Sequence, residues 1–345
     1  MTPRLDIHFS REERRCFRKG KEYTLPKGEY WLNHCRSGIQ LALQASELQP
    51  QTGVGTMVYN CHTVMNAIRQ AGCKPVFVDI TEGMTIDMED LAKKREQMQV
   101  LIVSHLFGII NDVKAIKKRY PDLIIIEDCA HCFEHEIEGE FGVYSIGQGK
   151  FPSIGDGGLL KANSLESERI RELDDMYAAL PGYTKKQERK LYVRLWMKAM
   201  MYSKGLYWLT RRMKGMRELG NESVREEVTI KKMSRGIANI LAHKRADYPV
   251  AVQERLQNAA ITSERVRELG SECIIGENAF MAVVMCEEPE ALKKMLAKRG
   301  IETETHFKHC IDWAKEFGYV EGSCPTAEYL TRHLLMIPTY CELKN

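Results

Sequence analysis

Two ionisable residues, Asp128 and Lys150, stand in surroundings that favour chemistry. Asp128 follows residues 123–126, an apolar and β-branched run of the length expected for a buried strand of a parallel sheet. In open α/β sheets ligands bind just beyond the carboxyl ends of the strands, which is where Asp128 would lie. Lys150 stands among small, flexible residues within the segment 145–158. The simplest chemistry that uses both residues is that of pyridoxal phosphate (PLP), in which a lysine forms a Schiff base and an acid holds the pyridinium nitrogen.

The elements expected to position this pair alternate between short apolar strands and helices. A helix over 37–45 starts with Ser-Gly, and its first backbone N–H groups would suit a phosphate, although an ordinary serine N-cap explains the same residues. Further strands are predicted at 56–59, 75–79 and 100–105, and further helices at 63–72 and 112–120. This alternation predicts an α/β fold with a mostly parallel sheet wrapped by helices.

The C-terminal part of the chain predicts a smaller α+β unit. It contains, in order, a predicted helix, strand, helix and alternating strand at residues 255–269, 280–285, 289–299 and 301–307. A chain of 345 residues is long enough for one large and one small domain. We assign residues 1–245 to a large PLP-binding domain and 246–345 to a small C-terminal domain. Residues 1–35 are expected to form a polar lead-in.

A basic helical segment, residues 163–245, interrupts the alternation of strands and helices. Within 185–217 lysines and arginines far outnumber acids, and aromatic residues and methionines are interspersed among them. Such helices can lie on an anionic membrane surface or take a nucleic acid or a lipid-linked substrate. Amphipathic helices mostly face a core, so packing on the sheet or on a second subunit is favoured. We predict no nucleic-acid partner and keep a peripheral membrane contact by 185–217 as a further hypothesis.

The composition is that of an ordinary globular protein. Apolar residues make up 44% and charged residues 28%, and the net charge of +3 predicts no acidic partner by itself. The chain starts with polar and charged residues, and no apolar run approaches the ~18 residues of a membrane-spanning helix. The eleven cysteines have no framework spacing and are expected to be reduced thiols. We therefore expect a cytoplasmic protein.

Six motifs, in order, resemble those of the DegT/StrS-type sugar-nucleotide aminotransferases, which are PLP enzymes with the aspartate-aminotransferase fold (fold type I). The family pattern Ser-Phe-x-x-x-Lys-x-x-x-x-Gly-Glu-Gly-Gly is met by Ser145, Lys150, Gly155, Asp156, Gly157 and Gly158. The Glu-Asp-x-Ala-Gln/His pattern is met by Glu127, Asp128, Ala130 and His131. Four further stretches are similar to family signatures, at residues 71–79, 104–108, 324–328 and 337–340. The resemblance runs from about residue 37 to residue 340.

The resemblance implies a PLP-dependent aminotransferase that transfers an amino group, with glutamate as donor, to a keto-sugar nucleotide. Such products feed the biosynthesis of surface polysaccharides and related sugars, and family sites are usually built at the interface of a homodimer. By position, Lys150 would bond to PLP and move the proton, and Asp128 would pair with the ring nitrogen. The other residues implied to contact the cofactor are His131, Ser145, Ser37, Gly38, Ile39, Cys61 and His62. The residues implied to lie near the sugar are His306 and Phe307.

Departures from the family pattern leave other functions open. Ile39 stands where the family often has threonine, and Cys61 stands where an aromatic residue usually stacks on the cofactor, so His62 or Tyr59 would stack instead. One alternative is a catalytically idle relative that acts as a regulatory or assembly protein. Another is a PLP-dependent sugar dehydratase, although those relatives replace the lysine with histidine. We predict no metal site, because the C-x-x-C at 129–132 lacks a second pair of ligands.

Overall fold

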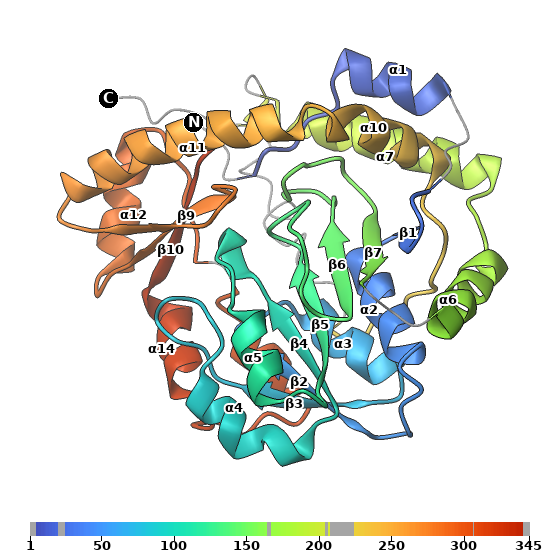
Figure 1. Cartoon of the computed structure of the whole chain (residues 1–345). Helices are drawn as coiled ribbons and strands as arrows, with labels where there is room; N and C mark the ends of the chain where they lie inside the picture. Colours follow the sequence, from blue (N-terminus) through green and yellow to red (C-terminus); the bar gives the residue numbers. More distant parts are fainter. Residues whose placement is uncertain are drawn as a thin grey trace.

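The protein is described here from a computed structural model. The described residues are 5–19, 25–163, 167–203, 206–207, 224–305 and 307–340. Two β-sheets and the helices around them form the body of the molecule, with the larger sheet in the lower half of Figure 1 and the smaller sheet beside it.

The larger sheet has seven strands in the order β1-β7-β6-β5-β4-β2-β3. The five strands from β3 to β6 along this order are parallel, whereas β7 and β1 are antiparallel to their neighbours. The bounds are β1 Glu29–Leu32, β2 Gly53–Met57, β3 Lys74–Val78, β4 Val100–Ser104, β5 Ile124–Cys129, β6 Phe141–Ser145 and β7 Gly158–Ala162. The predicted α/β class with a mostly parallel sheet is confirmed.

Helices cover both faces of this sheet, as the apolar strands require. Alternate residues of a strand point to opposite faces, so a strand that is buried on both sides is apolar throughout. In β4, Val100 and Ile102 belong to one hydrophobic cluster, and Leu101 and Val103 belong to the other. Two pairs of helices contribute to these two clusters, with bounds α2 Cys35–Gln44, α3 His62–Gln70, α4 Met88–Lys94 and α5 Val113–Arg119. In Figure 1, α2 and α3 lie behind the sheet and α5 lies in front of it.

The smaller sheet is antiparallel, in the order β10-β9-β8. Its strands are β8 Cys273–Ile275, β9 Met281–Met285 and β10 Leu334–Pro338. The helices of this part are α11 Tyr248–Arg267, α12 Pro289–Lys298, α13 Cys310–Lys315 and α14 Pro325–His333. One face of the sheet packs on α12 and on the end of α11. The predicted boundary at residue 245 falls between α10 and α11, and the division into two domains stays a prediction.

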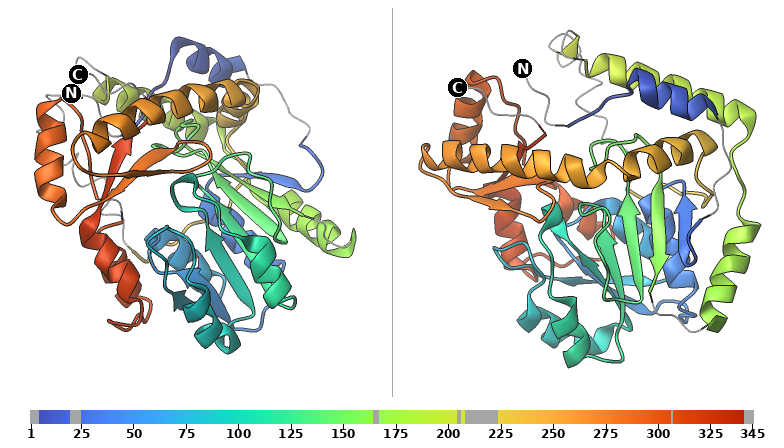
Figure 2. Two further views of the ribbon diagram at one scale, coloured as in Figure 1. Left: turned by 60° about the vertical axis from the view of Figure 1, so that its left-hand side comes forward. Right: turned by 45° about the horizontal axis from the view of Figure 1, so that its top comes forward.

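A layer of helices lies beyond one end of the large sheet. It contains α1 Arg11–Lys19, α7 Lys185–Met201 and α10 Arg235–Arg245, while α6 Ser167–Ala179 lies lower, beside β1 and β7. Helix α1 packs along α10, and its Phe17 meets Tyr192 of α7 edge-on. Figure 2 shows α1 running beside α7 above α10. Within the described residues, no helix combines the length and apolarity needed to span a membrane.

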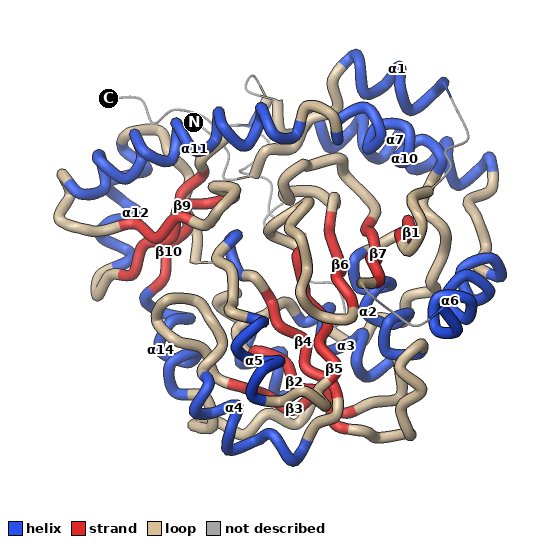
Figure 3. The backbone as a smooth tube through the Cα atoms, viewed as in Figure 1, coloured by secondary structure: helices blue, strands red, loops and turns tan. Residues whose placement is uncertain are grey.

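Three local predictions are wrong. The expected polar lead-in at 1–35 contains α1 and β1. Helix α1 buries Phe17 and Glu13, but its many arginines make the amphipathic pattern hard to recognise in the sequence. The helix expected at residue 37 begins at Cys35, after His34 in an extended conformation. The strand expected at 301–307 forms isolated bridges at Ile301 and Glu304 in place of a strand, the latter to Met336, and the apolar β10 completes the small sheet instead. Figure 3 shows β10 beside β9 in red.

Candidate active site

The acid Asp128 lies at the carboxyl end of β5, beside Ser104 at the end of β4. Ser104 Oγ donates a hydrogen bond to Asp128 Oδ2 at 3.1 Å, and the N–H of Ala130 donates to Oδ1 at 3.1 Å. Asn60 Nδ2 in turn donates to Ser104 Oγ at 2.8 Å. A chain of buried hydrogen bonds therefore leads from the loop between β2 and α3 to the acid.

Opposing effects act on the charge of Asp128. The residue is 6% exposed, and burial raises the pKa of its carboxyl above the ordinary value. The positive charge of Lys150 and the hydrogen bonds from Ala130 and Ser104 lower the same pKa. Lys150, Ala130 and Ser104 therefore stabilise the negative charge of Asp128 in a site where water contributes little. Such a carboxylate favours a cationic partner in the cavity beside it.

Lys150 lies in the connection between β6 and β7, which turns sharply. The N–H of Lys150 donates to Gly147 O at 3.2 Å, and Gly149 just before it has a φ of +74°. Gly155, further along the same loop, has a φ of +108°. Residues with a side chain rarely adopt a backbone φ in this left-handed region. Glycine at these two positions therefore lets the loop turn back toward the sheet. Lys150 therefore lies in the same cavity as residues at the ends of the strands.

Asp128 and Lys150 line one cavity of about 110 Å³. Its walls come from the ends of β4, β5 and β6, the first turns of α2 and α3, and the segment before α13. The predicted site residues that line it are Lys150, Asp128, His131, Ser145, Ile39, Cys61 and Phe307. The parallel strands therefore bring together residues that are far apart in the sequence, at the edge where ligands of such sheets bind.

Two of the residues predicted for the phosphate side are not in the described lining of this cavity. Ser37 is fully buried and its Oγ donates to Asn33 Oδ1 at 2.9 Å, and Gly38 packs against β6 and β7. Because α2 begins two residues before Ser37, Cys35 and Arg36 of its first turn face the cavity instead. His306 lies outside the described residues.

Cys61 occupies the N-cap of α3 and lines the cavity. Burial would raise the pKa of its thiol, but hydrogen bonds from His62 and Thr63 hold the pKa below the ordinary value. Thr63 Oγ1 lies 3.1 Å from the sulfur. The rings expected to stack in its place turn elsewhere: His62 meets Trp313 edge-on at 4.9 Å, and Tyr59 is buried against Phe307. Phe307 is the aromatic residue that reaches the lining from this side.

The ring of His131 is fixed by contacts on its edge and its face. The N–H of Phe107 donates to its Nδ1 at 3.0 Å, so the proton of the neutral ring is on Nε2. The ring of Phe280 stacks on the imidazole with centroids 4.6 Å apart and planes 19° from parallel. His131 therefore presents a ring of fixed orientation to the cavity next to Asp128.

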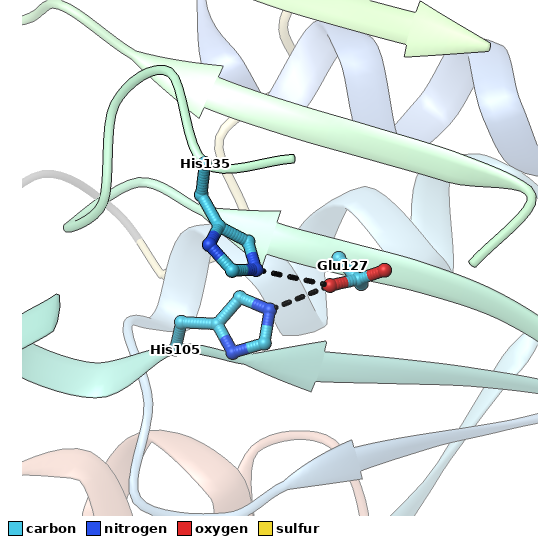
Figure 4. A group of neighbouring side chains, drawn as sticks. All are labelled: His105, Glu127 and His135. Atoms are coloured by element: carbon cyan, nitrogen blue, oxygen red, sulfur yellow. Dashed lines mark hydrogen bonds and ion pairs between the residues drawn. The ribbon is translucent and has the colours of Figure 1, made fainter. Parts of the chain in front are cut away.

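A second cluster is formed by His105, Glu127 and His135, and Glu127 directly precedes Asp128 in the sequence (Figure 4). Their possible metal-ligating atoms lie within 4.8 Å of one another. The N–H of Asn111 donates to His105 Nδ1 at 3.1 Å, so the ring proton is on Nε2, which donates to Glu127 Oε2 at 2.8 Å. A metal ion on Nε2 would require a proton on Nδ1, where it would face the N–H of Asn111. The hydrogen bonding therefore favours a proton, rather than a metal ion, between His105 and Glu127.

Glu127 completes the support of the strand ends. Its Oε1 accepts the N–H groups of Glu138 and Gly139, both at 2.6 Å. Burial would raise the pKa of Glu127, but the hydrogen bonds from His105 and from these two N–H groups hold the pKa below the ordinary value. A buried carboxylate with three donors fixes β4, β5 and the following loop relative to one another. Its neighbour in sequence, Asp128, is fixed with it.

The residues of this site that sequence reasoning missed include Asn60, Ser104, Cys35 and Arg36. Ser104 had a usable signal, because it ends a predicted strand and the carboxyl ends of parallel strands meet at one edge. Cys35 and Arg36 had none, since they enter the site only through the earlier start of α2.

Comparison with known proteins decides the family. The profile of the DegT/DnrJ/EryC1/StrS aminotransferase family matches residues 30–345. The chain belongs to this family. A pleiotropic regulatory protein of Geobacillus stearothermophilus is 25% identical over 332 residues, which are 89% of this chain and 78% of that protein. A UDP-N-acetyl-3-dehydro-alpha-D-glucosamine 3-aminotransferase of Acidithiobacillus ferrooxidans is 32% identical over 152 residues, covering 39% of this chain and 41% of that one.

The fold is shared with solved structures of DegT relatives. A Streptococcus pneumoniae protein, solved in its PLP form, superposes with a TM-score of 0.73 at 16% identity and covers 99% of this chain and 94% of that one. The site of the present chain fits PLP by the chemistry of its groups. A buried carboxylate, a lysine and a phosphate-compatible helix N-terminus with Arg36 and Ser145 nearby line one cavity.

Proposed function

We propose that this DegT-family protein is a PLP-dependent aminotransferase that transfers an amino group from glutamate to a keto-sugar nucleotide. The observation that supports it best is the meeting of Lys150 and Asp128 in one cavity, close enough for the charge of the lysine to lower the pKa of the acid. The Acidithiobacillus relative named for a 3-dehydro sugar nucleotide supports the class of acceptor.

The cofactor, when bound, supplies an electron sink for the carbon that carries the amino group. Asp128 would keep the ring nitrogen of the cofactor protonated, and Ser104 and Ala130 hold the Asp128 carboxylate in place. Ser145 and the first turn of α2, with Arg36, would hold the phosphate through hydroxyl, backbone N–H and guanidinium donors. Lys150 Nζ would be the base that takes the proton from the substrate carbon and the acid that gives it back.

Covalent attachment at Lys150 is the first test. Wild-type protein loaded with PLP should absorb near the visible edge, and borohydride should fix the cofactor on the peptide that contains Lys150, as located by mass spectrometry. Lys150→Ala should lose both signals, whereas Lys161→Ala, a lysine of β7 that is paired with Glu134, should keep them. Wild-type protein that never acquires the band would refute the proposal.

A catalytically idle regulator is a second candidate, favoured by two observations. The Geobacillus relative carries the name of a regulatory protein, and Cys61 takes the place of the expected stacking ring. An aminotransferase changes the cofactor band when glutamate is added without acceptor. Protein that binds PLP on Lys150 but gives no such change with glutamate, glutamine or aspartate would support the regulator and exclude the transferase.

We propose that the active form is a homodimer, as is usual for this fold type. Light scattering after size-exclusion chromatography should give a mass near twice that of the 39.6 kDa chain. A monomer that retains full activity would contradict this proposal.

A further inference from the structure

The inner side of α7 is fixed to the loop that carries Lys150. Leu195 is buried against Gly155 of that loop, and Arg194 Nη2 lies 2.7 Å from Asp156 Oδ2. A capping box at the N-terminus of α7 stabilises its first turn. The helix is therefore held in one orientation, with its opposite side turned away from the molecule.

The outer side of α7 carries an exposed apolar stripe. Val193, Trp196, Met197 and Met200 are 46%, 39%, 49% and 42% exposed. Their spacing of i, i+3, i+4 and i+7 puts them on one face of the helix. Among the described residues, nine large apolar side chains are this exposed, and Leu206 brings the number within 193–206 to five. Apolar side chains gathered in this way mark an interaction surface.

Basic side chains border the stripe on two helices. The exposed ones are Lys185, Lys186, Arg189 and Lys190 on α7, and Arg11, Arg15, Arg18 and Lys19 on α1. Tyr192 joins the helices, since it meets Phe17 edge-on at 5.4 Å and lies under the guanidinium of Arg18. A groove of about 890 Å³ beside Tyr192 is lined by five basic residues of α1 and by one acid, Glu12. The views of Figure 2 agree that α1 and α7 lie on the same side of the molecule.

The charge of this surface decides between its possible occupants. A second copy docked by a two-fold axis would bring one basic face against another, and like charges would oppose the contact. A nucleic acid would use the basic side chains but would gain little from an aliphatic stripe of valine and methionines. An anionic bilayer uses both parts, because its head groups attract lysine and arginine while tryptophan and aliphatic side chains enter the interface.

We propose that α1 and α7 form a surface that docks on an anionic lipid bilayer, with the stripe around Trp196 entering the head-group region. The protein would then lie on the membrane, without spanning it. This inference does not depend on the proposed enzymatic function. Through Arg194 and Leu195, the docked helix is in direct contact with the loop that carries Lys150.

Vesicle flotation of the full-length protein tests this. Wild type should float with vesicles of phosphatidylcholine and phosphatidylglycerol at low salt, and should stay behind with phosphatidylcholine alone. The triple variant Lys186→Glu, Arg189→Glu, Lys190→Glu should bind at least ~100-fold more weakly, because each basic residue near an anionic surface contributes to the free energy of membrane binding. The control Lys294→Glu, Lys298→Glu, Arg299→Glu carries the same change of charge on and just after α12, and should bind as wild type does.

The apolar stripe is tested by Trp196→Ser with Met197→Ser. This variant should also lose flotation, while its cofactor band stays that of wild type, since neither side chain lines the candidate active site. Equal binding of the charge-reversed and wild-type proteins would overturn the proposal. A second pair of results would also overturn it: wild type does not bind anionic vesicles, and the stripe variant converts a dimer into a monomer. The stripe would then bind a second copy of the chain.

Discussion

Removal of one hydroxyl, by Ser104→Ala, should change the proton equilibrium of the candidate site. Ser104 Oγ donates to Asp128 Oδ2 at 3.1 Å and itself accepts from Asn60 Nδ2 at 2.8 Å. All three side chains are buried, so water does not readily replace the lost donor. The substitution leaves Asp128 with the N–H of Ala130 as its remaining short hydrogen bond among the described residues.

The size of the effect follows from the charge on the acceptor. A hydrogen bond to a charged group contributes about 1.5–3 kcal/mol. One pH unit corresponds to about 1.36 kcal/mol of difference between protonation states. Because Ser104 stabilises the ionised form, its loss should raise the pKa of Asp128 by about one to two pH units beyond the increase that burial already causes.

PLP retention as a function of pH measures this change. A protonated Asp128 no longer pairs with a cationic ring nitrogen, so PLP should dissociate from Ser104→Ala at a pH about one to two units higher than from wild type. Ser104→Thr should restore the wild-type midpoint, because it keeps a hydroxyl. Ser46→Ala is the control: Ser46 is buried in the same way, but its Oγ donates to Ala42 O, away from the cavity. If Ser104→Ala and Ser46→Ala lose PLP at the same pH, the reasoning about Asp128 is wrong.

Three further predictions concern the same region. Because burial raises the pKa of Asp128, its ionised form weakens the fold as the pH rises above the ordinary value of 3.8; cofactor-free Asp128→Asn should therefore resist urea better than wild type at neutral pH and lose this advantage at acid pH. Glu127→Ala removes the acceptor of three donors, two of them buried, and should lower the free energy of unfolding by about 3–5 kcal/mol, with a smaller loss for Glu127→Gln; equal losses would argue against the hydrogen-bonded support. Alkylation followed by peptide mass spectrometry should label Cys61 at a lower pH than Cys273, whose pKa is raised to about 11, and PLP should protect only Cys61; identical pH profiles would contradict the lowered pKa of Cys61.

The central pair could be predicted from sequence because strand topology alone brings it together. Asp128 follows a continuous apolar run and Glu127, and the glycines around Lys150 permit a tight loop at the same edge of the sheet. These are local patterns with a fixed geometric consequence in a parallel sheet. The fold class follows from the same regularity, which repeats in β2, β4 and β5.

The features that could not be predicted depend on contacts between distant segments. The strand β2 begins at Gly53, earlier than expected, since its two glycines are weak strand formers. A Cβ at Gly53 would lie 1.8 Å from Gln97 O, so the close approach of another segment, invisible in sequence, requires the glycine. The start of α2 is of the same kind, because Ser37 Oγ donates to Asn33 Oδ1, and Asn33 is itself hydrogen-bonded to Thr229 and Lys231 of a distant segment. Its displacement by two residues changes which side chains reach the phosphate side.

The departure from the family pattern at Cys61 is part of one connected structure. Asn60 Oδ1 accepts the N–H of Cys61 at 2.7 Å, and Asn60 Nδ2 leads through Ser104 to Asp128. Ser104 therefore gives the acid a donor in the same chain that has cysteine in place of a stacking ring at 61. A stacking contact holds a cofactor ring by area, whereas an acid kept ionised holds it by charge. Retention of the cofactor in this protein should therefore depend more on the proton balance of Asp128 than on packing over the ring. This is why the hydroxyl of Ser104, rather than an aromatic side chain, is the informative residue to remove.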